Sequence, residues 1–153
     1  MKNLRQILII EDNADDQALL LRQLKKAGLG QHIKVIPDGR EALAYLTNEQ
    51  FVREDLSAIF LDLKLPKVSG LKVLETIRSH ERLHAIPVIV MTSSNSPEDL
   101  DQCRNFGVYS FVQKPLAFSS FAKAFADTFH TRRVATMVRE ESGHDFGMTS
   151  LPA

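Results

Sequence analysis

A small set of polar residues with chemical potential stands at the ends of short apolar runs. The set is Glu11 and Asp12 after "QILII", Asp62 after "AIFL", Thr92 after "VIVM" and Lys114 after "YSFVQ". If these runs are parallel strands, three carboxylates, a hydroxyl and an ammonium meet at one edge of a sheet. Clustered carboxylates need protons or a cation, and Mg²⁺ prefers oxygen ligands. Because Mg²⁺ usually takes one or two carboxylates, a third remains free to attack a phosphoryl group, which a lysine and a hydroxyl can stabilise.

A second pattern, "HERLH" at residues 80–84, fits the zinc-protease motif H-E-x-x-H. That motif works only on an unbroken helix, where both imidazoles share one face. Pro87 follows three residues after His84, and an apolar run begins at once, so the helix cannot continue. We therefore expect solvated loop histidines here, not a zinc site.

Five short apolar runs predict the strands that position these residues, and each is followed by a helical pattern. The predicted strands are 6–10, 33–37, 58–63, 87–92 and 109–113, and the predicted helical segments are 11–28, 38–50, 71–79, 96–107 and 114–129. Such alternation predicts a parallel α/β sheet with helices on both faces.

Composition and length are typical of one globular domain. The 153 residues contain 19 basic and 19 acidic side chains, so net charge gives no reason to expect binding to nucleic acid or to an anionic membrane. No apolar run reaches the roughly 18 residues of a membrane span, and the single cysteine, Cys103, cannot form an intramolecular disulfide. We therefore expect a cytoplasmic protein that binds neither nucleic acid nor membrane.

From about residue 5 to 130, the chain resembles the receiver domains of two-component response regulators. The matching segments begin with "IIEDN" and "FLDLKLPKVSG". The resemblance implies that Asp62 is the phosphoacceptor and a metal ligand. It also implies that Asp12 binds Mg²⁺ directly, that Glu11 binds it through water, and that the Lys64 backbone carbonyl is a further ligand.

The segments "VMTSS" and "FVQKP" complete the resemblance. They place Thr92 at the switch hydroxyl, Phe111 at the switch aromatic and Lys114 at the family's lysine. Phosphorylation is then expected to draw Thr92 toward the phosphoryl group and Phe111 inward. The surface formed by the fourth helix, fifth strand and fifth helix would change with them.

The resemblance implies a flavodoxin-like, doubly wound fold with a five-stranded parallel sheet in the order 2-1-3-4-5. Residues 1–130 would form the receiver and residues 131–153 a helical extension and tail, with no output domain. Such a protein accepts a phosphoryl group from a sensor histidine kinase or a histidine phosphotransfer protein. It is not an enzyme beyond its own phosphorylation and dephosphorylation. It looks most similar to single-domain regulators of phytochrome-type kinases, although use as a relay fits the same residues.

Two other functions are less consistent with the residues. A binding module that works without phosphate would not need the acids and Lys114. An aspartate phosphatase of the haloacid dehalogenase type would carry a second Asp two residues after the nucleophile, where this chain has Lys64. The Lys64 side chain either covers the phosphorylation site or extends to solvent.

A homodimer is expected through the side of the fifth helix, with residues 131 to about 141 contributing. Phe118, Phe121, Phe125 and Phe129 form one helical stripe, which core packing mostly explains. Beyond them, Val134, Met137 and Val138 continue at spacings of three and four. The alternative is a frayed tail.

Overall fold

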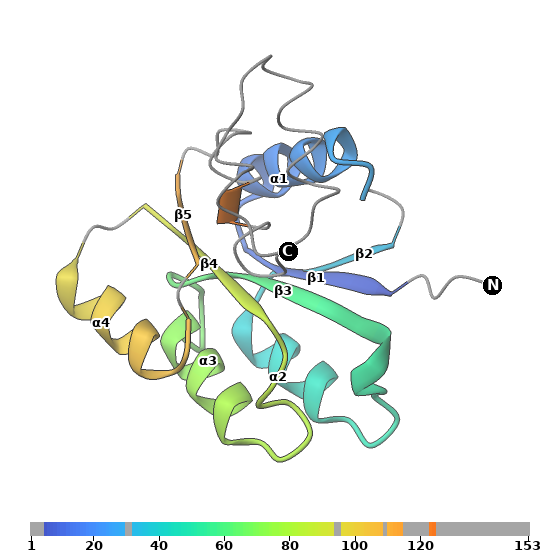
Figure 1. Ribbon diagram of the computed structural model, residues 1–153, viewed down its shortest axis with the longest axis vertical. Helices are drawn as coiled ribbons and strands as arrows, with labels where there is room; N and C mark the ends of the chain where they lie inside the picture. Colours follow the sequence, from blue (N-terminus) through green and yellow to red (C-terminus); the bar gives the residue numbers. More distant parts are fainter. Residues whose placement is uncertain (1–4, 30–31, 94–95, 109, 115–122, 125–153) are drawn as a thin grey trace, which may run out of the picture.

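The computed structural model describes residues 5–29, 32–93, 96–108, 110–114 and 123–124. Strands and helices alternate along this part of the chain (Figure 1). The strands are β1 (Gln6–Ile10), β2 (Ile33–Ile36), β3 (Leu56–Asp62), β4 (Val88–Thr92) and β5 (Phe111–Gln113). The helices are α1 (Ala14–Lys26), α2 (Gly39–Thr47), α3 (Gly70–Ser79) and α4 (Pro97–Asn105), with a 3₁₀ turn η1 (Arg53–Asp55) before β3.

All five strands are parallel, and their order across the sheet is β2-β1-β3-β4-β5. The predicted fold is therefore confirmed. The order reverses direction next to β1, where β2 lies on one side and β3 on the other. In sheets of this kind, the crevice at the carboxyl ends of the strands beside that reversal is the usual binding site.

The sheet is buried on both faces, which explains why the central strands are continuously apolar. Side chains alternate between the faces along each strand. Leu8 and Ile10 join the core beneath α2, α3 and α4, whereas Ile7 and Ile9 join the core beneath α1. Figure 1 shows α1 on one side of the sheet and α2 and α3 on the other. The strand ends are consequently held by two packed layers.

Much of the predicted fifth helix lies outside the described residues. Lys123 and Ala124 are described and helical, and Ala124 is buried in the core beneath α1. The phenylalanine stripe and the proposed dimer segment from residue 131 onward also lie outside the described part. Among the described helices, none is long and apolar enough to cross a membrane.

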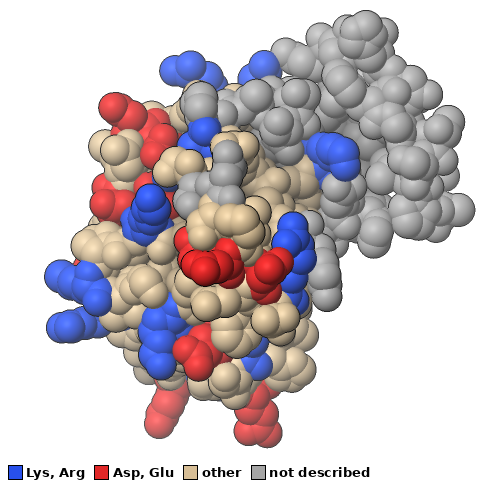
Figure 2. All heavy atoms as spheres, turned by 90° about the vertical axis from the view of Figure 1, so that its left-hand side faces the viewer, with Lys and Arg blue, Asp and Glu red and all other residues tan. Residues whose placement is uncertain are grey.

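Surface charge on the described residues does not separate by sign on the face shown in Figure 2. Basic and acidic side chains are interspersed over that face. This arrangement agrees with the balanced composition of the chain. It offers no broad basic patch there for a polyanion to bind.

The loop between β3 and α3 passes very close to the first residue of α3, and glycine makes that approach possible. A Cβ atom on Gly70 would collide with the Asp62 carbonyl oxygen and would lie 2.5 Å from Leu63 Cα. Both are backbone atoms that cannot rotate away. Gly70 N–H also donates to the Leu63 carbonyl at 2.9 Å. The absence of a side chain at Gly70 therefore fixes α3 against the end of β3.

Gly70→Ala should lower the free energy of unfolding by about 3 kcal/mol, because the new methyl group forces backbone apart in a packed region. Denaturant titration measures the loss. Gly107→Ala is the control: a Cβ there would lie 3.6 Å from Arg78 Nε, so the cost is mainly the left-handed backbone at φ 79°, about 1 kcal/mol. Equal losses in the two variants would contradict the close-approach argument.

Candidate functional site

The residues singled out in the sequence converge at the carboxyl edge of the sheet. Glu11 and Asp12 follow β1, while Asp62 and Thr92 are the last residues of β3 and β4. Oxygen atoms from the three carboxylates lie within 4.8 Å of one another. Asp12 is exposed, whereas Glu11 and Asp62 are buried. The cluster is therefore open to solvent on one side only.

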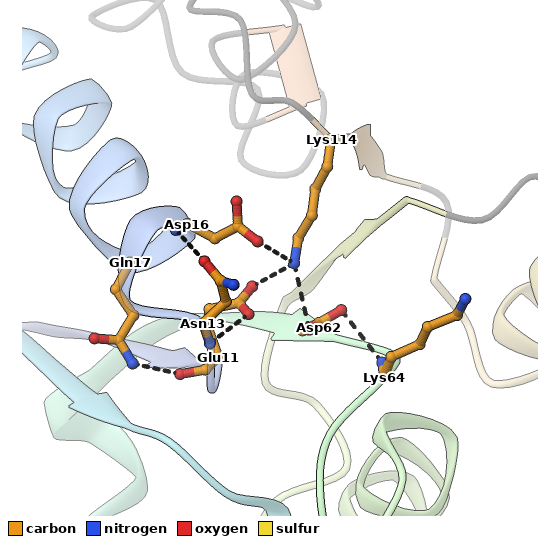
Figure 3. Close-up of polar contacts among 7 residues, drawn as sticks. All are labelled: Glu11, Asn13, Asp16, Gln17, Asp62, Lys64 and Lys114. Carbon is orange, nitrogen blue, oxygen red and sulfur yellow. Dashed lines mark hydrogen bonds and ion pairs between the residues drawn. The ribbon is translucent and has the colours of Figure 1, made fainter.

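Lys114, directly after β5, places its ammonium among three carboxylates (Figure 3). Its Nζ lies 2.7 Å from Glu11 Oε1, 2.9 Å from Asp16 Oδ2 and 3.3 Å from Asp62 Oδ2. Lys114 N–H donates to the Thr92 carbonyl at 2.9 Å, which ties the start of this loop to β4. One cation thus faces acids from three elements.

Burial dominates the electrostatics of Glu11. The side chain is fully buried, and desolvation raises its pKa to about 7, although the nearby Lys114 ammonium and the hydrogen bond from the Asn13 N–H oppose the shift. Burial would on its own lower the pKa of the Lys114 ammonium, but Glu11, Asp16 and Asp62 together raise it above its usual value. Lys114 is consequently a permanent cation, and Glu11 is the group that can exchange a proton near neutral pH.

The loop after β1 is ordered by its own polar groups. Asn13 N–H donates to Glu11 Oε2 at 3.1 Å, and Gln17 Nε2 donates to the Glu11 carbonyl at 2.6 Å. Asn13 also caps α1, because its Oδ1 accepts from Asp16 N–H at 2.9 Å. The cap of the helix and the acid pair are therefore one hydrogen-bonded unit.

Asp62 presents two distinct carboxylate oxygens. Oδ1 accepts from Lys64 N–H at 3.2 Å, whereas Oδ2 faces the Lys114 ammonium. The Lys64 side chain is exposed and runs away from the Asp62 carboxylate in Figure 3. Of the two alternatives for Lys64, this arrangement matches extension to solvent.

The geometry suits a divalent cation. Glu11 Oε1 is buried and accepts no aligned hydrogen bond from the described residues, although it lies within ion-pair distance of Lys114. Three carboxylates around one open point are a typical donor set for a hard cation such as Mg²⁺. A cation there would give Glu11 a second positive neighbour besides Lys114 and would offset the excess negative charge.

Comparison of the sequence with known protein families identifies the family of this chain. The family model for the response regulator receiver domain matches residues 7–126. The chain is a response regulator receiver. The receiver is 40% identical over 118 residues to the probable methanogenesis regulatory protein FilR2 of Methanothrix harundinacea (strain 6Ac), covering 76% of each protein.

Solved structures of receivers agree with this assignment. The bacteriophytochrome response regulator AtBRR superposes with a TM-score of 0.72 at 42% identity, covering 84% of this receiver and 94% of that chain. The Mn²⁺-bound form of response regulator Rcp1 superposes with a TM-score of 0.67 at 29% identity, covering 82% of this receiver and 93% of that chain. The curated Rcp1 sequence comes from Synechocystis sp. (strain ATCC 27184 / PCC 6803 / Kazusa), and 112 residues are 36% identical.

The predicted switch residues of the receiver lie on the neighbouring strands β4 and β5 and differ in exposure. Thr92 is buried at the end of β4. Phe111, the first residue of β5, is half-buried against the core beneath α4, and the Arg104 guanidinium carbon lies 5.4 Å from its ring centroid. Their places in the fold match the prediction, whereas their roles stay predictions.

The "HERLH" segment of the receiver lies between α3 and β4, outside any α-helix. Helix α3 ends at Ser79, and His80 to Ala85 form turns before β4. His84 is exposed, and His80 Nδ1 accepts from Arg82 N–H at 3.1 Å. The prediction that the helix does not continue through both histidines is confirmed.

Asp16 was not predicted as a site residue. Acids in the first turn of a helix are ordinary because they complement the helix dipole, so Asp16 does not stand out from its neighbours. Only the position of Lys114 reveals it. A useful signal would have been an acid in the first turn of α1, five residues after Glu11, in a chain with a lysine at the end of β5.

Mg²⁺ affinity should depend on pH through Glu11. A cation competes with the proton on this carboxyl, so the apparent dissociation constant should rise up to about tenfold for each pH unit below 7 and level off above it. Titration of Mg²⁺ followed by amide chemical shifts between pH 5.5 and 8.5 measures this. Glu11→Gln is the control and should bind more weakly with a flatter profile. A wild-type profile as flat as that of the variant would contradict the role of Glu11.

Proposed function

We propose that this receiver accepts a phosphoryl group on Asp62 from a phosphohistidine and signals in its phosphorylated state. One observation carries the proposal: a buried carboxylate lies between an acid pair and a lysine whose ammonium is 3.3 Å away. Phosphoryl transfer needs mainly positioning and charge stabilisation. This edge of the sheet supplies both.

The proposed step is transfer of one phosphoryl group from a phosphohistidine to Asp62. A carboxylate oxygen of Asp62 forms the new O–P bond while the N–P bond of the phosphohistidine breaks, and that bonding pair stays on the imidazole nitrogen. Lys114 is proposed to stabilise charge on the phosphoryl oxygens, and the Thr92 hydroxyl to donate a hydrogen bond to one of them. Hydrolysis by water would later return Asp62 to its free form.

Mg²⁺ is the proposed cofactor, with Glu11 bound through water, Asp12 and Asp62 bound directly, and the Lys64 main-chain carbonyl as a further ligand. When bound, the ion offsets charge between nucleophile and phosphoryl oxygens. The acid cluster supports this proposal, as does the Mn²⁺-bound form of Rcp1. Geometry and oxygen ligands favour Mg²⁺ or Mn²⁺ over softer metals.

The proposed donor is a sensor histidine kinase or a histidine phosphotransfer protein, because both present the same phosphohistidine chemistry. Similarity to AtBRR favours a phytochrome-type kinase. The proposed response moves Thr92 toward the phosphoryl group and Phe111 inward. Because Arg104 of α4 lies over the Phe111 ring, such a movement would alter the surface of α4 and β5.

Acetyl phosphate with Mg²⁺ should add one phosphoryl group to the protein, and Asp62→Asn should abolish the labelling, since Asp62 is the carboxylate that lies beside both the acid pair and the Lys114 ammonium. Intact-protein mass spectrometry measures it. Asp55→Asn changes an exposed acid in the 3₁₀ turn η1, before the opposite end of β3, and is the matched control that should label normally. Undiminished labelling of Asp62→Asn would refute the assignment, and labelling that survives a chelator would remove the metal role.

We also propose that the chain forms a homodimer through the side of the fifth helix, with residues 131–141 contributing. The support is the sequence stripe of Val134, Met137 and Val138. Light scattering at tens of micromolar should give a dimer for the full chain and a monomer for a truncation after Thr131. A full-length monomer, or a truncation that dimerises equally well, would contradict the proposal.

A further inference from the structure

Lys114 has three carboxylate partners, but only two of them belong to the acid cluster that could hold a metal ion. Glu11 and Asp62 are members of the acid cluster that could hold a metal ion. Asp16 is not a member of that cluster, although its Oδ2 lies 2.9 Å from the Lys114 ammonium. Metal binding and phosphorylation would therefore engage two of the three partners and leave Asp16 free to hold the lysine.

The contact of Asp16 with the Lys114 ammonium has better hydrogen-bond geometry than the contact of Glu11 with it. It is a hydrogen bond as well as an ion pair, whereas Glu11 Oε1 accepts no aligned hydrogen bond despite its shorter distance to Nζ. The Lys114 side chain is 12% exposed and that of Asp16 27%, so solvent screens this pair only partly. The first turn of α1 favours an ionised acid at this position.

The backbone of Asp16 is tied to the same loop that carries the acid pair. Its N–H donates to Asn13 Oδ1 at 2.9 Å, and Asn13 N–H in turn donates to Glu11 Oε2. Asp16 therefore has a fixed position relative to Glu11. An ammonium anchored to Asp16 would keep a defined distance from the metal-binding loop and from Asp62.

We propose that Asp16 is a positioning residue that anchors Lys114 from the α1 side throughout the phosphorylation cycle. The inference rests on the proposed function of Asp62 and Lys114. When Glu11 and Asp62 take a cation and a phosphoryl group, Lys114 needs one partner that neither process removes. Asp16 is that partner among the described residues, and it directs the ammonium toward the phosphoryl oxygens without touching them.

The test compares Asp16→Asn with Asp15→Asn and Asp16→Glu. Asp15 lies in the same first turn of α1, is exposed, and is not among the carboxylates that form ion pairs with Lys114 in the described part of the chain, so its variant reproduces the change in charge and in helix dipole. Phosphorylation by acetyl phosphate at saturating Mg²⁺ is followed by mass spectrometry. The Mg²⁺ dissociation constant of each variant is measured separately.

Asp16→Asn should slow phosphorylation three- to tenfold with less than a twofold change in Mg²⁺ affinity. Asp15→Asn should behave as wild type, and Asp16→Glu should recover at least half of the wild-type rate, because a carboxylate is restored. Equal rates in Asp16→Asn and Asp15→Asn would overturn the inference. So would a slow Asp16→Glu, or a loss of Mg²⁺ affinity large enough to explain the slower rate. Failure of the wild-type protein to label would instead refute the proposed function.

Discussion

An excess of negative charge at one edge of the sheet is the constraint on which the rest of this structure depends. Lys114 pairs with Glu11, Asp16 and Asp62, and Asp12 lies in the same acid cluster as Glu11 and Asp62, so four carboxylates share this edge with one ammonium. Two of the acids are buried, where repulsion is weakly screened. The arrangement persists because elements that are stable for other reasons hold it in place.

The two apolar cores provide that stability. Residues of β1 and β3 contribute to both cores; Glu11 directly follows β1, and Asp62 is the last residue of β3. Moving either carboxylate away would require a shift of strands packed on both faces, and close-packed interiors resist such shifts. The loops add local restraint through the Asn13 cap and the glycine contact behind Asp62. Repulsion among the carboxylates destabilises this edge locally, and packing of the two apolar cores around the sheet offsets that cost.

Most of the fold and most of the site could be predicted from the sequence because both depend on strand ends. Continuous apolar runs identify strands buried on both faces, and parallel strands place their carboxyl ends together. Strand limits were less accurate: β5 begins at Phe111 rather than at residue 109, and β3 begins two residues earlier than predicted, at Leu56. The limits of short edge strands and the starts of strands depend on hydrogen bonds to the neighbouring strand, which an apolar run in the sequence does not predict. Asp16 escaped prediction for a similar reason, since its partner lies 98 residues away in the chain.

The charge balance also implies a coupling between the two ligands of the site. With every group ionised, four carboxylates and one ammonium leave three negative charges in excess, and a divalent cation removes two of them. Replacing the Asp62 carboxylate by an acyl phosphate adds further negative charge, because a phosphoryl group carries about −1.5 to −2 at neutral pH. A cation should then bind the phosphorylated form more tightly than the free form. By linkage, the same cation would favour phosphorylation by an equal factor, so the acid cluster and the proposed phosphoacceptor Asp62 would act as one thermodynamic unit.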